Sequence, residues 1–247
     1  MLKEERLDFI INRLKSNQSV KLIELSESLQ VSADTVRRDI EFLARSGLLT
    51  KVRGGAIPHS PNAHSFKERI HIAEDEKLLI AHKALSLIRP GQTILLDGGT
   101  TTYVLASLLQ MPLTIITPNI PAAALLAGKK DMDVIIPGGR VLPDSQATSG
   151  ADAIRLLRQL HVDTCFIGVC SLHHEIGVSS MDFFESEMKR EMINCSDKIV
   201  AVGSHNKIGT AEPFKVCEIH VLDTIVTEID PANALFEPYR SLDIEII

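Results

Sequence analysis

Residues 20–56, VKLIELSESLQVSADTVRRDIEFLARSGLLTKVRGGA, form the stretch that decides the fold of the first part of the chain. Ser32 can accept a hydrogen bond from a free backbone N–H of the residues that follow, so a helix is predicted to begin immediately after it. Val36, Ile40 and Leu43 recur at helical spacing and therefore share one buried face. The opposite face, which carries most of the polar side chains, is free to contact a partner.

Two amphipathic segments precede this helix, and a basic ribbon follows it. The apolar stripes of these segments are Leu7, Ile10, Ile11 and Leu14, and Leu22, Leu25 and Leu29. The ribbon covers residues 48–53 and is closed by Gly54 and Gly55. Three short helices around one small core, followed by a two-stranded ribbon, are the layout of a winged helix-turn-helix. The sequence therefore predicts a DNA-binding domain over residues 1–57.

The candidates for contact with DNA are Ser32, Thr35, Arg37, Arg38, Lys51 and Arg53. A recognition helix turns its N-terminal residues toward base edges in the major groove. Each helix arginine either pairs with guanine O6 and N7 or binds a phosphate, and the sequence leaves both roles open. The threonine contacts a phosphate or a thymine methyl, and the ribbon cations reach phosphates or the adjacent minor groove. A merely solvated helix face is the alternative, but it does not explain the cap, the ribbon and the glycines together.

Charge is divided unevenly along the chain. The 26 basic and 32 acidic residues give a net charge of −6, yet residues 1–57 hold 10 basic and 8 acidic residues. Only this part therefore offers a basic patch for DNA. Residues 58–64, PHSPNAH, are polar and interrupted by proline, which is typical of a linker. We predict a linker over residues 58–74 and a second domain over residues 75–247, long enough for its own core.

The remaining composition argues against several other classes of protein. The sequence has no apolar run of eighteen residues and no apolar N-terminal segment, so we expect no membrane span, no signal peptide and a cytoplasmic location. The cysteines lack CxxC spacing and are predicted to be reduced core residues; they are Cys165, Cys170, Cys195 and Cys217. We expect no metal site, no cofactor and no catalytic residue.

Beyond the linker, short apolar strands alternate with helical segments. A helix is predicted over residues 75–88, and further helices near residues 102–109, 121–127, 152–160 and 183–196. Strands are predicted at residues 93–96, 114–117, 134–136, 164–169, 199–202 and 220–227. This alternation predicts an α/β domain with a mostly parallel sheet, whose ligands bind beyond the carboxyl ends of the strands.

The loop after the first of these strands holds the main ligand candidates, which are Asp97, Gly98, Gly99, Thr100, Thr101 and Thr102. The loop opens a helix, so consecutive N–H groups and hydroxyls converge where the helix dipole favours an anion. Glycine lets the backbone close on a phosphate without a Cβ in the way. The alternative interpretation is a tight strand-to-helix turn with threonine caps.

Further candidates follow other strands or lie on a nearby helix, and they are Gly138, Gly139, Arg140, Glu185, Lys189 and Lys207. Arg140 and Lys207 supply positive charge, while Asp97 and Glu185 can accept hydrogen bonds from sugar hydroxyls. This combination suits a phosphorylated sugar. A plain surface position is an open alternative for Lys207 and the favoured one for Arg140. Lys189 can instead form an i,i+4 salt bridge with Glu185.

Through these motifs the chain resembles the DeoR-type family of bacterial transcriptional regulators over nearly its whole length. The matching motifs are TVRRDI at residues 35–40, Leu43, Gly47, GGA at 54–56, DGGTT at 97–101, GG at 138–139, FIG at 166–168 and ESEMKR at 185–190. The resemblance implies a sensor domain similar in fold to ribose-5-phosphate isomerase. Such a domain binds a phosphorylated sugar or related metabolite, which alters affinity for double-stranded operator DNA. The resemblance further implies a repressor of a carbohydrate operon that acts as a homo-oligomer, either a dimer or a tetramer.

The chain departs from the family pattern at two positions. Pro118 stands between Thr117 and Asn119, where the family often has threonine directly before asparagine, and proline removes a backbone donor. Ser204 stands where the family tends to have an aspartate, three residues before Lys207. Both changes bear on the geometry of the effector site.

Two other functions compete with this one. A sugar-phosphate isomerase-like enzyme with a fused DNA-binding domain would use Asp97, Glu185 and Lys207 as acid, base and oxyanion partner. It is not favoured, because fold similarity does not settle function and the DNA-binding domain would be idle. A purely architectural DNA binder does not explain so large an acidic domain. The sequence leaves open the sugar, the operator, the direction of the response and the oligomeric state.

Overall fold

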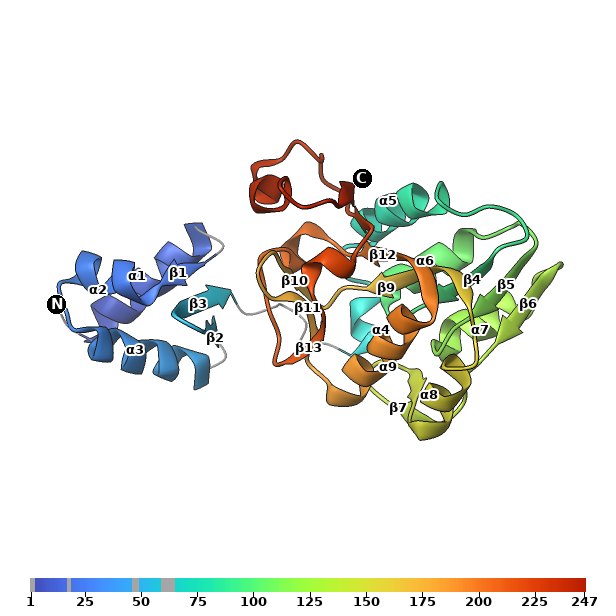
Figure 1. Ribbon diagram of the computed structural model, residues 1–247, viewed down its shortest axis with the longest axis horizontal. Coiled ribbons are helices and arrows are strands. Elements are labelled where there is room, and N and C mark those ends of the chain that lie inside the picture. The colour runs from blue at the N-terminus through green and yellow to red at the C-terminus, as the bar shows by residue number, and fades with distance from the viewer. Residues whose placement is uncertain (1–2, 17–18, 46–48, 59–64) are drawn as a thin grey trace.

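The computed structural model describes residues 3–16, 19–45, 49–58 and 65–247, which form a small helical part and a larger α/β part (Figure 1). Three features expected from the sequence fall outside these residues. They are Leu48 at the start of the predicted ribbon, Gly47 of the family motif, and residues 59–64 of the predicted linker.

Three helices and a three-stranded sheet make up the N-terminal part. They are α1 (Lys3–Ser16), β1 (Val20–Lys21), α2 (Leu22–Leu29), α3 (Ala33–Arg45), β2 (Leu49–Val52) and β3 (Gly55–Pro58). The predicted stripes meet in one core, which contains Ile10, Leu14, Leu25, Leu29, Val36, Ile40 and Leu43. Helical spacing therefore identified the buried faces correctly, and the predicted winged helix-turn-helix is confirmed.

The wing has one strand more than the two-stranded ribbon that the sequence predicts. β1, only two residues long, pairs antiparallel with β3, which also pairs antiparallel with β2. Gly54 has a φ of +85°, and a Cβ on Gly55 would lie 2.0 Å from the carbonyl oxygen of Val20. The turn therefore requires the first glycine, and the close approach of β1 requires the second.

An ion pair joins α1 to α3. Arg6 donates from Nε to Oδ2 of Asp39 at 2.8 Å and from Nη2 to Oδ1 at 3.3 Å. The side chain of Asp39 is 3% exposed and that of Arg6 is 14% exposed. Because a buried carboxylate loses its hydration, these two charge-assisted hydrogen bonds are needed to compensate it.

The larger part is built on a seven-stranded sheet with the order β15-β14-β12-β9-β4-β5-β6, in which the strands pair in parallel. The strands are β4 (Thr93–Leu96), β5 (Leu113–Ile116), β6 (Met132–Ile135), β9 (Val162–Gly168), β12 (Ser196–Val202), β14 (Thr224–Val226) and β15 (Glu245–Ile246). The predicted α/β fold with a mostly parallel sheet is confirmed.

Helices cover both faces of this sheet (Figure 1). One face is covered by α5 (Glu74–Leu85), α6 (Thr100–Leu108) and α7 (Ile120–Leu126), and the other by α8 (Ala151–Leu157) and α9 (Phe183–Asn194). The sequence pattern does not indicate the short helix α4 (Phe66–Arg69), which lies within the predicted linker. Phe66 is buried, and its N–H donates to the carbonyl oxygen of Asp144 at 2.6 Å, so α4 packs on the α/β part.

The predicted strand at residues 220–227 is too long. Its first residues belong to the 3-10 helix η2 (Ile219–Val221), and β14 begins only at Thr224. Asp223 explains the boundary, because its carboxylate accepts a hydrogen bond from the N–H of Ile199 at 2.7 Å. That side chain occupies the place where a longer ladder would continue.

A smaller antiparallel sheet and a hairpin complete the fold. The sheet has the order β10-β11-β13, with β10 (Ser171–His173), β11 (Gly177–Ser180) and β13 (Phe214–Cys217). The hairpin joins β7 (Arg140–Leu142) to β8 (Ala147–Ser149), and the remaining short helices are η1 (His205–Lys207) and η3 (Ala234–Tyr239). These short elements show neither a periodic pattern nor a continuous apolar run, so the sequence does not predict them.

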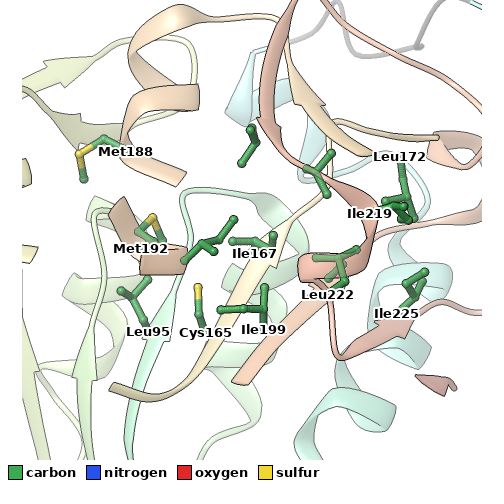
Figure 2. Packing of buried hydrophobic residues seen from close by; sticks show 14 of the residues in the cluster. Leu95, Cys165, Ile167, Leu172, Met188, Met192, Ile199, Ile219, Leu222 and Ile225 are labelled. Atoms are coloured by element: carbon green, nitrogen blue, oxygen red, sulfur yellow. The ribbon is translucent and has the colours of Figure 1, made fainter. Parts of the chain in front are cut away.

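The two faces of the parallel sheet bury separate cores. Along β9, Cys165 and Ile167 face the core under α8 and α9, whereas Phe166 faces the core under α5, α6 and α7. Figure 2 shows the first core, in which Met188 and Met192 of α9 lie beside the strands. Alternate residues of one strand therefore fix the helices on both sides.

All four cysteines are free, as the sequence predicts, and Cys165 and Cys195 are buried. Among the described residues, no helix is long and apolar enough to cross a membrane.

We expect Asp39→Asn to loosen the contact between α1 and α3, because a neutral amide cannot accept two charge-assisted hydrogen bonds from Arg6. The loss is about 1.5–3 kcal/mol of local stability. Hydrogen exchange followed by mass spectrometry should show faster exchange in residues 3–16 and 33–45. Asp34→Asn, the matched change at an exposed pair, should cost less than about 0.5 kcal/mol. Equal effects of the two substitutions would contradict this role of the pair.

Candidate functional site

The N-terminus of α3 is held by its own side chains. The Ser32 hydroxyl accepts a hydrogen bond from the N–H of Thr35 at 3.2 Å and lies 2.9 Å from the Thr35 hydroxyl. Asp34, exposed in the first turn, pairs with Arg37. Arg38 is also exposed, and within the described part of the chain it forms no hydrogen bond or ion pair. Arg38 is therefore the helix cation most available to a base or a phosphate.

The wing and α3 form a basic groove. Arg37, Lys51 and Arg53 line the groove together with Lys21 of β1. Lys51 Nζ lies 2.5 Å from Oε1 of Glu41, which ties the wing to α3. Sequence reasoning missed Lys21, because its position depends on the pairing of β1 with β3. The groove brings cations of the helix and the wing to one face, as binding to DNA phosphates requires.

A cavity of about 260 Å³ opens at the carboxyl ends of β4, β9 and β12. The predicted residues that line it are Asp97, Gly98, Gly99, Thr100, Thr101, Glu185, Lys189 and Lys207. They come from the loop after β4, from α9 and from η1. Parallel strands place their carboxyl ends at one edge of the sheet, so these separate segments meet there.

The loop after β4 leaves the N-terminus of α6 open to the cavity. Thr102 does not line the cavity, because its hydroxyl donates to the carbonyl oxygens of Asp97 and Gly99, at 2.7 and 2.8 Å, and closes the turn. No side chain caps the helix at Gly99. The first N–H groups of a helix have no partner within it, so this wall of the cavity attracts anions.

Gly138, Gly139 and Arg140 do not line the cavity. They lead into the hairpin of β7 and β8, where a Cβ on Gly139 would lie 2.5 Å from the carbonyl oxygen of Ser149. Arg140 is exposed at the start of β7. Gly138 and Gly139 therefore reflect the close packing of a hairpin. The other glycine pair, Gly98 and Gly99, instead precedes a helix.

The cavity contains a buried ion pair. Lys189 Nζ contacts Oδ2 of Asp97 and donates to the carbonyl oxygen of Gly168 at 2.8 Å. The N–H of Gly168 donates to the same Oδ2 at 2.9 Å. Both charged side chains are only 6% exposed. Burial alone would lower the pKa of Lys189, but the nearby Asp97 raises it above its ordinary value, so the ammonium group stays charged.

Sequence reasoning missed two other cations of the cavity, Arg69 and Lys77. Lys77 is 8% exposed and donates from Nζ to the carbonyl oxygens of Arg69, Ile70 and Ile72. These hydrogen bonds fix the end of α4 beside the cavity. The Nε of Arg69 is buried without a partner. No sequence signal marks either residue, because both look like ordinary cations on the exposed side of a helix.

Lys207 lines the cavity from the end of η1. Within the part of the chain that the structure describes, its ammonium group forms no hydrogen bond or ion pair. Burial lowers the pKa of Lys207 to about 8; Cys170 opposes this change, and the positive charge of Arg69 adds to it. At neutral pH this cation lacks a close counter-charge, so an anionic ligand would stabilise it.

Both departures from the family pattern lie in the wall of this cavity. Pro118 cannot donate a hydrogen bond, and its carbonyl oxygen accepts one from the N–H of Thr148 at 2.9 Å. The Ser204 hydroxyl donates to Oδ1 of Asn206 at 2.9 Å. The serine thus braces the turn of η1, and it brings no negative charge to Lys207.

The arrangement suits binding better than proton transfer. Oδ2 of Asp97 accepts hydrogen bonds from Lys189 and from the N–H of Gly168. This carboxylate oxygen is therefore already bound by two donors of the protein, whereas a general base must lie within hydrogen-bond reach of the substrate proton that it abstracts. Glu185 accepts a weaker hydrogen bond from the Ser180 hydroxyl at 3.4 Å.

A winged helix-turn-helix followed by an α/β domain with a polar cavity defines a class of DNA-binding proteins that carry a sensor domain. Residues 6–61 match the DeoR-like helix-turn-helix domain, and residues 72–229 match the DeoR C terminal sensor domain. The chain belongs to the DeoR family of DNA-binding transcriptional regulators, as its motifs predict.

The chain is similar to known regulators over nearly the full length of both proteins. The HTH-type transcriptional regulator GolR of Listeria innocua is 30% identical over 250 residues, covering 100% of this chain and 98% of GolR. The HTH-type transcriptional repressor GlcR of Bacillus subtilis is 30% identical over 252 residues, covering 100% and 96%. The glycerol-3-phosphate regulon repressor of Escherichia coli is 29% identical over 240 residues, covering 96% and 95%. The isomerase-like alternative is therefore not favoured.

Parts of the fold are also similar to solved structures of other proteins. For eIF2B delta from Chaetomium thermophilum the TM-score is 0.46 at 14% identity, covering 65% of this chain and 58% of that one. For ribose 5-phosphate isomerase A from Methanocaldococcus jannaschii the TM-score is 0.40 at 17% identity, covering 54% of each chain. Likeness at this level says nothing about function.

Lys189→Met should lower the free energy of unfolding of the α/β part by about 3–5 kcal/mol, because Asp97 is then buried without its counter-charge. The double variant Asp97→Asn with Lys189→Met removes both charges and should recover part of this loss. Urea unfolding followed by circular dichroism measures both. A double variant as unstable as the single one would contradict the assigned pairing.

Lys207 should make stability depend on pH in the alkaline range. Its pKa is about 8 in the folded chain and 10.5 when unperturbed, so between these values the unfolded chain binds more protons and stability rises with pH. Lys207→Met removes this titration. We expect the variant to be more stable than the wild type by about 1–3 kcal/mol at pH 7, with the gap closing toward pH 10.

Urea unfolding of both proteins across this range tests the pH dependence. Lys67→Met, at an exposed lysine on α4, is the matched control and should show no such trend. A gap between the wild type and Lys207→Met that stays constant with pH would show that Lys207 is not perturbed by burial.

Proposed function

We propose that this regulator represses a carbohydrate operon, and that a phosphorylated sugar or related metabolite in the cavity controls its affinity for double-stranded operator DNA. The observation that carries the proposal is the uncapped N-terminus of α6 facing the same cavity as the uncompensated Lys207. Each of these features attracts an anionic group such as a phosphate, while Glu185 offers a carboxylate to sugar hydroxyls. The names of two relatives, a repressor and a glycerol-3-phosphate regulon repressor, support the proposal.

Two segments connect the cavity to the wing. Arg69 lies on α4, which follows the stretch of chain leading from β3. Thr50 of β2 donates from Oγ1 to the carbonyl oxygen of Ala211 at 3.0 Å, and Ala211 follows Lys207 closely in the chain. A ligand that binds Arg69 acts on the first segment, and a ligand that binds Lys207 acts on the second. Coupling of about 1–3 kcal/mol would change DNA affinity roughly 5- to 150-fold.

The proposal includes an assembly and a location. Helix-turn-helix proteins commonly bind two half-sites as symmetric dimers, so we propose a homo-oligomer with paired wings, working in the cytoplasm where bacterial operators lie. The units are residues 1–57 for DNA, residues 58–74 as the connection and residues 75–247 for the effector. Sedimentation of the full chain with and without a duplex tests the assembly, and a monomer bound to DNA would contradict it.

The experiment that tests the function is fluorescence anisotropy of a labelled duplex taken from upstream of the gene, titrated with and without a panel of sugar phosphates. The expected result is tight, salt-dependent binding that one metabolite changes at least five-fold. Tight binding that no phosphorylated metabolite changes would contradict control by a phosphorylated sugar. Failure to bind any duplex from the operon would contradict the repressor assignment.

Arg38→Ala should weaken operator binding by about 1–3 kcal/mol, roughly 5- to 150-fold, because this exposed arginine has no partner among the residues that the structure describes. The salt dependence of binding shows which role it plays. The slope should fall by about one if Arg38 binds a phosphate and stay unchanged if it reads a base. Arg155→Ala, at an exposed cation on α8, is the matched control. Equal operator affinities of the two variants would show that Arg38 does not contribute to DNA binding.

A further inference from the structure

The charged side chains that line the cavity are not balanced. The basic ones are Arg69, Lys77, Lys189 and Lys207, and the acidic ones are Asp97 and Glu185. Lys189 is compensated by Asp97, and the Nζ of Lys77 donates to backbone carbonyl oxygens. The positive charges of Arg69 and Lys207 remain after these interactions have been made.

Arg69 and Lys207 act on each other. Both side chains line the cavity, and the charge of Arg69 lowers the pKa of Lys207 beyond the effect of burial. Glu212, which lies outside the cavity lining, offsets part of this effect, yet the pKa of Lys207 stays below its ordinary value. Lys77 holds the end of α4, so Arg69 is kept in place, with its Nε buried and unpartnered. Two neighbouring cations and a buried unpaired donor form a site that favours an anion.

The segment that carries Lys207 and the N-terminus of α6 follow different strands of the sheet. β4, which leads into α6, and β12, which leads into η1, pair with opposite edges of β9. Neighbouring strands are spaced by about 4.8 Å, so the ends of β4 and β12 lie roughly 10 Å apart across β9. One phosphate group is too small to contact both places at once.

Building on the proposed function, we propose that the cavity holds two anion subsites, one at the N-terminus of α6 and one at Arg69 and Lys207. The effector is then a sugar derivative with an anionic group at each end of its carbon chain. A sugar bisphosphate and a phosphorylated sugar acid share this chemistry. Asp97 and Glu185 lie in the same cavity and can accept hydrogen bonds from the hydroxyl groups between the two ends.

Inorganic phosphate is the probe that tests the two subsites. Relaxation-optimised amide NMR spectra of the full chain should show two sets of phosphate-dependent shifts, in residues 97–102 and 203–209, each of which saturates. Arg69→Gln with Lys207→Gln should weaken binding at the second set at least ten-fold and change the first less than two-fold. Lys67→Gln, on the same helix as Arg69 but outside the cavity lining, should leave both sets within two-fold.

The outcomes separate this inference from the proposed function. Shifts at residues 97–102 alone would overturn the second subsite and leave a monophosphate effector standing. Shifts at neither set would overturn both. Loss of both sets in the double variant would also overturn the inference, because the two anions would then share one site.

A second arm distinguishes the ligand types. Fructose 1,6-bisphosphate and 6-phosphogluconate each carry anions at both ends, whereas fructose 6-phosphate carries one. Displacement of phosphate from both sets of residues by fructose 1,6-bisphosphate or by 6-phosphogluconate supports the inference. The bisphosphate acting better would indicate a second phosphate in the effector, and the sugar acid acting better would indicate a carboxylate. Displacement of phosphate from both sets by fructose 6-phosphate at the same concentration would overturn it.

Discussion

The α/β part depends on the buried pair of Asp97 and Lys189. The carboxylate sits at the end of β4 and the lysine on α9, and both bind the backbone of Gly168 at the end of β9. The pair therefore joins two neighbouring strands to the helix that covers them. The two charges compensate each other inside the cavity, so that the field felt by a ligand comes mainly from the other charged residues of the lining. Removing one partner alone would leave the other charge buried without compensation, so each of the two side chains requires the other.

Most of the N-terminal fold follows from local pattern. Val36, Ile40 and Leu43 mark a helix face whatever it packs against, and the Ser32 cap sets its start within one residue. β1 could not be predicted in this way, because two residues carry no period and are ordered only by pairing with β3. Lys21 reaches the basic groove through that pairing, so a cation of the DNA face depends on a contact distant in sequence.

In the sensor domain, too, features set by local pattern were predictable and features set by contacts distant in sequence were not. Continuous apolar runs revealed the buried parallel strands, and the fold then brought their loops to one edge, as expected for such sheets. The role of each loop was harder to predict, because paired glycines precede a helix at Gly98 and Gly99 but precede a hairpin at Gly138 and Gly139. Arg69 and Lys77 carry no signal, since the Lys77 ammonium group is buried against carbonyl groups at the end of α4 that only the tertiary fold places there.

Two cations of the cavity lie on the segments that lead toward the wing; Lys207 was predicted from the sequence, and Arg69 was not. A ligand gains most from groups that folding leaves uncompensated, and these are Arg69 on α4 and Lys207 beside the segment that meets Thr50 of the wing. Asp97 and Lys189 already compensate each other, so this pair gains less from an anionic ligand. Differential interaction with two arrangements is what shifts an equilibrium, so under the proposed control by a ligand we expect the response to involve Arg69 and Lys207 rather than the buried pair.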